Sequence, residues 1–252
     1  MKLTVIIPTY NEAENLPRLV SALFAEPISD LHVLVVDDNS PDGTGQVAER
    51  LGGDFSPRLN VLHRGGKMGL GTAYIAGFQR ALQEGAQAVA QMDADSSHSP
   101  ARLPLMIETL ESCDVVLGSR YVRGGSVDVR WPLWRKSLSA FGNLYARVIL
   151  GLVVRDATGG YRLWRRETLL GMPLDQICSN GYAFQIEITY VATRLGYHFK
   201  EIPIYFADRQ WGHSKMSFRI QLEAATRVWQ MLFRYRSLRS HDHSAVQPPA
   251  QT

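Results

Sequence analysis

Short apolar runs alternate with segments of helical periodicity along the first half of the chain. The apolar runs predict strands at Leu3–Ile7, Leu31–Val36, Leu59–Leu62, Ala88–Met92 and Asp114–Gly118. The segments between them predict helices near Asn15–Ala25, Gly45–Leu51, Gly71–Glu84 and Ala101–Leu110. Alternation of this kind, at roughly 25 to 30 residues per unit, is typical of a mostly parallel sheet with helices on both faces. The predicted fold class is therefore α/β.

Polar clusters follow four of the predicted strands. They read PTYNE at 8–12, DDNSPDGT at 37–44, RGGKMGLG at 64–71 and DADSSH at 93–98. Open α/β sheets bind their ligands at the carboxyl ends of the strands. We therefore expect the functional site at this edge. The cluster 64–71 lacks the G-x-x-x-x-G-K-[ST] spacing, which argues against a P-loop nucleotide hydrolase.

Two carboxylates stand one residue apart directly after the fourth strand. In extended backbone, Asp93 and Asp95 leave the same face, and two hard oxygen ligands at a strand end suit a divalent cation. The alternative is an Asx turn before the helix that begins near Pro100, with Ser96, Ser97 or Ser99 as its cap. His98 is expected on a solvated turn without a catalytic role.

The second half of the chain contains two stretches that mix apolar, aromatic and basic residues. The first, 138–154, has Arg147 as its one charge, and the second, 217–239, combines Trp229 and Phe233 with five arginines. A basic amphipathic helix with interfacial aromatic residues can lie on an anionic bilayer. Packing against the sheet with a charged outer face is the alternative. No segment approaches the ~18 apolar residues of a membrane-spanning helix, and no signal peptide is recognised.

Composition and charge narrow the functional classes. A chain of 252 residues with 45% hydrophobic content suits one large domain. Its two cysteines form no disulfide framework, and each is expected to be a core residue in a reducing compartment. Residues 1–117 hold 8 Lys and Arg against 15 Asp and Glu, whereas residues 118–240 hold 19 against 8. An acidic half suits a metal ion and a basic half suits phosphate groups. No nucleic-acid-binding signature is present, so a nucleic-acid partner is not expected.

Several motifs, taken together in order, resemble a known family. VIIPTYNEAENL (5–16), VVDDNSPDGT (35–44), MDADSSHSP (92–100) and GSRY (118–121) are similar to inverting glycosyltransferases of the GT-A fold. The second half resembles, more narrowly, the polyprenol-phosphate (dolichol-phosphate) mannose synthases, through WPLWRKSLS (131–139), DATGGYRLWRRETL (156–169), NGYAFQIEI (180–188) and DRQWGHSKM (208–216). The likeness extends over about residues 3 to 232.

The resemblance implies a donor site at the carboxyl ends of the strands. The nucleotide pocket would be formed by Pro8, Tyr10, Glu12, Val36 and Asp38, where a carboxylate can accept hydrogen bonds from guanine. The donor diphosphate would be held by Asp93, Ala94 and Asp95 through Mg²⁺ or Mn²⁺. Ser97 stands where some members carry Gln, so its shorter side chain would reach the ion directly or through water.

The resemblance also implies how the acceptor and the leaving group are held. Arg120, Arg135 and Ser139 would bind the acceptor phosphate, with Asp95 and Arg120 as the catalytic pair. Arg209 and Lys215 would clamp the diphosphate, on a loop that Gly212 allows to hinge.

The implied activity is transfer of mannose from GDP-mannose to a polyprenyl (dolichyl-type) monophosphate lipid with inversion. Another sugar nucleotide, as in a polyprenyl-phosphate glucosyltransferase, is the alternative. We expect one GT-A domain over residues 1–239, with a nucleotide and metal half (1–117) and an acceptor and membrane half (118–239), followed by a disordered tail at 240–252. The expected location is the cytoplasmic face of a membrane, bound peripherally. A separate membrane-anchoring protein stays an open alternative.

Overall fold

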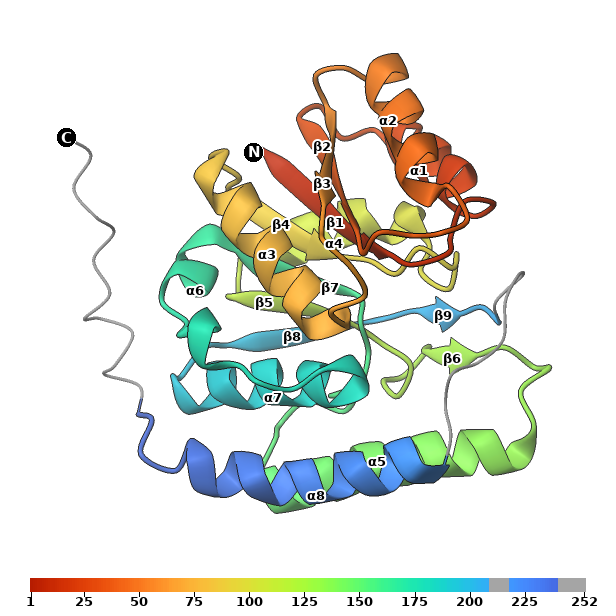
Figure 1. Cartoon of the computed structure of the whole chain (residues 1–252). Helices are drawn as coiled ribbons and strands as arrows, with labels where there is room; N and C mark the ends of the chain where they lie inside the picture. The colour runs from red at the N-terminus through yellow and green to blue at the C-terminus, as the bar shows by residue number, and fades with distance from the viewer. Residues whose placement is uncertain (209–217, 240–252) are drawn as a thin grey trace.

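The computed structural model describes residues 1–208 and 218–239. Among these, seven strands form one sheet in the order β3-β2-β1-β4-β7-β5-β8 (Figure 1). Six run parallel, and only β7 runs antiparallel, between β4 and β5. The mostly parallel α/β architecture predicted from the sequence is confirmed.

The first five strands match the predicted apolar runs. Their bounds are β1 (Leu3–Thr9), β2 (Leu31–Asp37), β3 (Leu59–His63), β4 (Ala88–Gln91) and β5 (Val115–Ser119). The strands β7 (Arg162–Arg165) and β8 (Phe199–Pro203) complete the sheet, and β6 (Ser126–Val127) pairs with β9 (Tyr205–Phe206) in a small separate ladder.

The four helices predicted in the first half are also present. They are α1 (Leu16–Phe24), α2 (Thr44–Asp54), α3 (Leu70–Gln83) and α4 (Leu103–Leu110), the last preceded by a 3₁₀ turn, η1 (Pro100–Arg102). The described second half adds α5 (Leu133–Leu150), α6 (Arg166–Leu170), the 3₁₀ turn η2 (Leu174–Gln176), α7 (Gly181–Arg194) and α8 (Phe218–Arg234).

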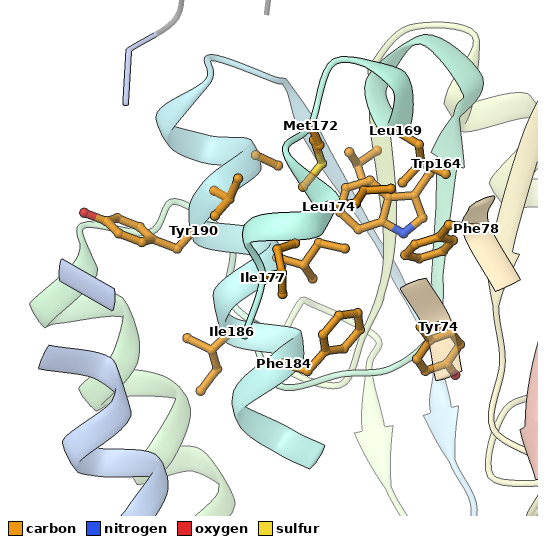
Figure 2. Close-up of a cluster of buried hydrophobic side chains, with 14 of the residues drawn as sticks. Tyr74, Phe78, Trp164, Leu169, Met172, Leu174, Ile177, Phe184, Ile186 and Tyr190 are labelled. Carbon is orange, nitrogen blue, oxygen red and sulfur yellow. The ribbon is translucent and has the colours of Figure 1, made fainter. Parts of the chain in front are cut away.

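Alternating side chains of the buried strands feed two hydrophobic cores, one on each face of the sheet. In β1, Val5 and Ile7 pack into the core under α1, α2 and α4, whereas Ile6 between them packs into the core under α3 and α7. This period of two is what a strand buried on both faces requires. The core under α3 and α7 is rich in aromatic rings, with Tyr74 and Phe78 of α3 facing Phe184 and Trp164 (Figure 2).

The strand β7 begins with a fully buried arginine. The Arg162 guanidinium donates hydrogen bonds to the carbonyl oxygens of Gly159 (3.0 Å) and Ala157 (2.9 Å). Burial lowers its pKa to about 9, so the group is still charged at neutral pH. Arg162 thereby fixes the loop that precedes β7, which carries residues of the site described below.

Helices α5 and α8 lie side by side beyond α7, on the side of the molecule away from α1 and α2 (Figure 1). The indole N–H of Trp229 on α8 donates to the Tyr145 hydroxyl on α5 at 2.9 Å. The two helices and the segments that flank α5 carry large hydrophobic side chains that are 47% to 85% exposed. We call these residues the apolar face: Val129, Leu133, Trp134, Phe141, Leu144, Val148, Val153, Trp229 and Phe233. Among the described residues, no helix combines the length and hydropathy needed to cross a bilayer.

Candidate active site

Three adjacent parallel strands bring their carboxyl ends to one edge of the sheet. Because β2, β1 and β4 are neighbours, the segments after Asp37, Thr9 and Gln91 converge there. A cavity of about 510 Å³ opens at this edge. Most of the predicted donor-site residues line it: Pro8, Tyr10, Glu12, Asp38, Asp93, Ala94 and Asp95. Val36 differs from the prediction, because its fully buried side chain points into the core and packs near Ile6.

The acidic turn after β4 is held by its own hydrogen bonds. Asp93 accepts a hydrogen bond from the Tyr74 hydroxyl (3.2 Å), and its backbone N–H donates to Nδ1 of His98 (3.2 Å). Asp95 is 5% exposed, and its Oδ1 accepts a hydrogen bond from the Ser97 N–H at 3.1 Å. The Asx turn considered from the sequence is therefore present, although Ser99 makes no side-chain cap bond to the following helix.

The oxygens of this turn suit a divalent cation only if a ligand completes the coordination. Within residues 1–208 and 218–239, no group of three or more His, Cys, Asp or Glu is placed to hold a metal ion. Two carboxylates and the Ser97 hydroxyl remain, and that buried hydroxyl has no hydrogen-bond partner among the described atoms. Magnesium-type ions commonly bind one or two carboxylates together with substrate phosphates. The donor set fits that arrangement.

His98 is buried rather than solvated, which corrects the prediction from the sequence. It is 1% exposed, stacks on Tyr161 with ring centroids 5.0 Å apart, and meets Phe206 edge-on at 5.5 Å. Burial lowers the pKa of its imidazole. The neutral ring accepts the Asp93 N–H through Nδ1, so His98 positions the acidic turn. Cys178 also differs from its prediction, since it is exposed, whereas Cys113 is buried as expected.

A salt bridge that was not predicted from the sequence fixes the loop 64–70, of which Lys67, Gly69 and Leu70 line the cavity. Arg64 contacts Oδ1 of Asp38 at 2.6 Å, and Oδ2 of Asp38 accepts the N–H groups of Met68 (3.0 Å) and Gly69 (3.2 Å). Gly69 has φ +101°, and a Cβ there would lie 2.9 Å from Oδ1 of Asn180. Asp38 thus organises this loop with its carboxylate. Lys67, also missed, lines the cavity 4.2 Å above the Tyr10 ring.

The predicted acceptor residue Arg120 is paired with a buried carboxylate. Its Nε and Nη2 donate to the two oxygens of Asp156, each at 2.7 Å, and Nη2 also donates to the Thr158 hydroxyl at 2.8 Å. Burial alone would raise the pKa of Asp156, but Arg120 outweighs it and the pKa is lowered. Asp156 is therefore ionised. Its position could have been noticed in the DATGGYRLWRRETL motif, but its partner is 36 residues away.

Helix α5 brings the two other predicted acceptor residues toward Arg120. Ser139 accepts a hydrogen bond from the Tyr121 hydroxyl at 2.7 Å. Arg135 contacts Asp208 at 3.2 Å and lies 3.7 Å above the Trp131 ring. Asn143, one turn further along, donates to the Thr158 hydroxyl (3.0 Å), and Thr158 also lines the cavity. We call Arg120, Arg135 and Ser139 the basic cluster. The loop 156–160 connects this cluster with the cavity. The predicted clamp residues Arg209 and Lys215, with Gly212, lie outside the described residues.

Comparison with known proteins gives consistent matches. The family model described as Glycosyl transferase family 2 matches residues 4–170. An undecaprenyl-phosphate mannosyltransferase of Micrococcus luteus is 46% identical over 242 residues, which cover 95% of this chain and 98% of that protein. A polyprenol monophosphomannose synthase of Mycolicibacterium smegmatis is 46% identical over 214 residues, 84% of this chain and 80% of that protein.

Solved structures show the same fold at lower identity. A mannosyltransferase from Pyrobaculum calidifontis, in complex with GDP-Man and Mn²⁺, aligns with a TM-score of 0.61 at 20% identity over 92% of this chain and 64% of that chain. Mannosyl-3-phosphoglycerate synthase from Rubrobacter xylanophilus aligns with a TM-score of 0.64 at 21% identity, over 94% and 74% of the two chains.

Proposed function

Because this chain belongs to glycosyl transferase family 2 and has the GT-A fold, we propose that it transfers mannose from GDP-mannose to a polyprenyl monophosphate with inversion at the anomeric carbon. The relatives at 46% identity carry names of that activity. The observation that carries the proposal is one continuous site, in which the acidic turn at Asp93 and the basic cluster around Arg120 are joined by the loop 156–160.

The cavity is the proposed donor site. Tyr10 and Glu12 contribute to the nucleotide end, where a carboxylate can accept hydrogen bonds from the N–H groups of guanine. Asp93 and Asp95, with Ser97 directly or through water, would hold Mg²⁺ or Mn²⁺ against the diphosphate. When bound, that ion supplies positive charge to the departing GDP. Arg209 and Lys215 are proposed to add to this charge.

The basic cluster is the proposed acceptor site. Arg120, Arg135 and Ser139 would bind the lipid phosphate beside the cavity. A phosphate monoester has its second pKa near 6, so most of it is dianionic at neutral pH. The acceptor can therefore attack the anomeric carbon without a protein base, and catalysis consists of alignment and stabilisation of the leaving group's charge.

The two faces of α5 explain how a lipid would reach this site. Arg135, Ser139 and Asn143 recur every four residues and form one stripe, which faces the site through the contacts given above. The exposed apolar residues of α5 form a second stripe: Leu133, Trp134, Phe141, Leu144 and Val148. At 100° per residue, the centres of the two stripes lie about 170° apart around the helix. The apolar face would then rest on the bilayer while phosphate-binding side chains point inward. Exposed Arg155 and Arg234 suit an anionic surface, whereas Arg227 lines the cavity. We propose that this bilayer surface is the cytoplasmic face of a membrane.

Removal of two large side chains from the apolar face should weaken membrane binding. Trp134 and Phe141 are 65% and 63% exposed, so Trp134→Gln/Phe141→Gln should fold normally. Because burial of a large apolar side chain contributes about 1.5–3 kcal/mol, partition onto phosphatidylglycerol-containing vesicles should fall at least tenfold. The measurement is co-sedimentation with vesicles. Leu105→Gln, at an exposed position on α4, is the matched control and should bind normally.

The apolar face could instead be covered by a second copy of the chain or by a separate anchoring protein, and each alternative predicts a different result. If the purified double variant changes from dimer to monomer in light scattering and still binds vesicles like the wild type, a second copy covers the apolar face. If the wild-type chain binds vesicles only when another membrane protein is added, a separate anchor holds it. Either result contradicts direct bilayer docking.

The activity itself is tested with a panel of labelled sugar nucleotides and a polyprenyl phosphate. We expect transfer from GDP-mannose, a β-linked lipid product and loss of activity in EDTA. Preference for UDP-glucose would assign the chain to a glucosyltransferase. Failure of every donor to label a polyprenyl phosphate would contradict the proposed function.

A further inference from the structure

The side-chain amide of Gln185 is buried at the cavity without a protein partner. Gln185 is 2% exposed, and both its Oε1 and Nε2 lack hydrogen-bond partners among the residues that the structure describes. It lines the cavity from the second turn of α7. Buried amides are nearly always hydrogen-bonded, because their desolvation otherwise opposes folding. An amide with both ends unpaired at a cavity wall therefore points to a ligand.

The amide lies beside the acidic turn. A Cβ added at Gly160 would be 3.3 Å from Oδ2 of Asp93 and 3.5 Å from Nε2 of Gln185, so one backbone position touches both groups. A side chain at position 160 would occupy this space, which Gly160 leaves open. A ligand bound beside Asp93 and Gly160 can therefore also contact the Gln185 amide.

Gln91 is a second buried glutamine with an unpaired atom, and it differs from Gln185 in its partners and its position. Gln91 also has an unpaired Nε2, but its Oε1 accepts the Trp164 indole N–H at 2.8 Å. It is absent from the residues that line the cavity. Gln91 therefore serves the core, whereas no described protein group accounts for the polar atoms of Gln185.

We propose that Gln185 recognises hydroxyl groups of the hexose that is transferred. The inference rests on the proposed function, in which Asp93 lies at the diphosphate to which the sugar is bonded. A side-chain amide presents one acceptor and one donor side by side, which matches two neighbouring hydroxyl groups. A neutral group also suits a neutral sugar next to two carboxylates. Gln185 is in this view a specificity-determining residue.

The first test compares GDP-mannose with its 2-, 3-, 4- and 6-deoxy analogues in the wild type and in Gln185→Met. A site built to bind a hydroxyl rejects the analogue that lacks it, because the site's polar group is then left unpaired. We expect the wild type to lose at least tenfold in kcat/KM with at least one analogue. For GDP-mannose, kcat/KM of Gln185→Met should be at least tenfold below that of the wild type. Within Gln185→Met, replacing GDP-mannose by that same analogue should lower kcat/KM by less than threefold.

Calorimetry makes the test independent of turnover. The ratio of the Kd values of GDP and GDP-mannose combines the contribution of the sugar with the extra charge of the GDP terminal phosphate, and comparing the ratio between wild type and variant cancels the charge difference. That ratio should be several-fold lower in Gln185→Met and in Gln185→Ala than in the wild type, while the Kd of GDP itself stays within twofold. Thr189→Val is the control: its buried hydroxyl donates to the Gln185 carbonyl oxygen (2.6 Å) one turn further along α7, away from the cavity lining. It should keep the wild-type pattern.

Several results would overturn the inference. Equal losses for every analogue in wild type and variant, or weaker GDP binding, would assign Gln185 to the nucleotide or to the fold. A ratio of the two Kd values that is the same in wild type and in both variants would also contradict it. If the wild type transfers mannose yet these patterns are missing, the sugar subsite alone is wrong. If no polyprenyl phosphate is labelled from GDP-mannose, the proposed function fails with it.

Discussion

Asp95→Asn is expected to reduce mannosyl transfer by about a hundredfold to a thousandfold while the fold stays intact. The loss follows from removal of one charge from the ligands of the proposed cation, which weakens stabilisation of the departing GDP. The fold should survive because an asparagine Oδ1 can still accept the Ser97 N–H that now bonds Asp95. The measurements are initial rates across a Mg²⁺ and Mn²⁺ titration and the thermal unfolding midpoint.

This substitution separates the two interpretations of the acidic turn. An Asx turn needs an acceptor oxygen but no charge, so Asp95→Asn preserves it. If Asp95 serves only the turn, the variant will be as active as the wild type at every metal concentration, and the cation assignment fails. Asp114→Asn is the matched control. Asp114 directly precedes β5, away from the carboxyl ends of the strands, and accepts the His198 N–H at 2.7 Å. The same chemical change there should leave the rate unchanged.

The first half of the fold could be predicted because local pattern and global topology agree there. Strands β1 to β5 are apolar runs bounded by polar turns, and their parallel order places Asp93 at the edge of the sheet where ligands bind. Strand β7 could not be predicted from pattern, because it is four residues long with an arginine at each end. It is an antiparallel strand between β4 and β5, and its Arg162 is buried only because loop carbonyl groups surround it.

The parts of the site that the sequence analysis missed depend on partners far along the chain. Arg64 fixes the loop that forms one wall of the cavity through Asp38, 26 residues earlier. His98 was expected on a solvated turn, but Tyr161 and Phe206 cover its ring. Gln185 belongs to a quoted motif, yet only the shape of the cavity reveals its unpaired amide. Side-chain spacing within a segment carries no information about such contacts.

Arg120→Lys should raise the KM for polyprenyl phosphate about tenfold to a hundredfold without a matching change in the Kd of GDP-mannose. A lysine keeps the positive charge beside Asp156, but an ammonium cannot bind a carboxylate and a phosphate with the planar fork of a guanidinium. Assays over a range of acceptor concentrations, with donor binding measured separately, test the prediction. Arg80→Lys is the control and should leave both constants unchanged, because Arg80 of α3 forms an exposed pair with Glu84 directly after that helix.

A neutral substitution at position 120 should instead show how much the Arg120–Asp156 pair contributes to the free energy of unfolding. Arg120→Met removes the guanidinium that hydrogen-bonds the fully buried Asp156 carboxylate and should cost about 3–5 kcal/mol of unfolding free energy at pH 7. In the wild type the pKa of Asp156 is lowered, so the pair contributes stability above the unfolded pKa of about 3.9 and loses it as the pH falls through the folded pKa. In Arg120→Met the folded pKa of Asp156 should rise, so its stability deficit should shrink as the pH is lowered from 7. If Arg120→Lys loses activity only in proportion to its loss of folded protein, Arg120 supports the fold and does not bind the acceptor.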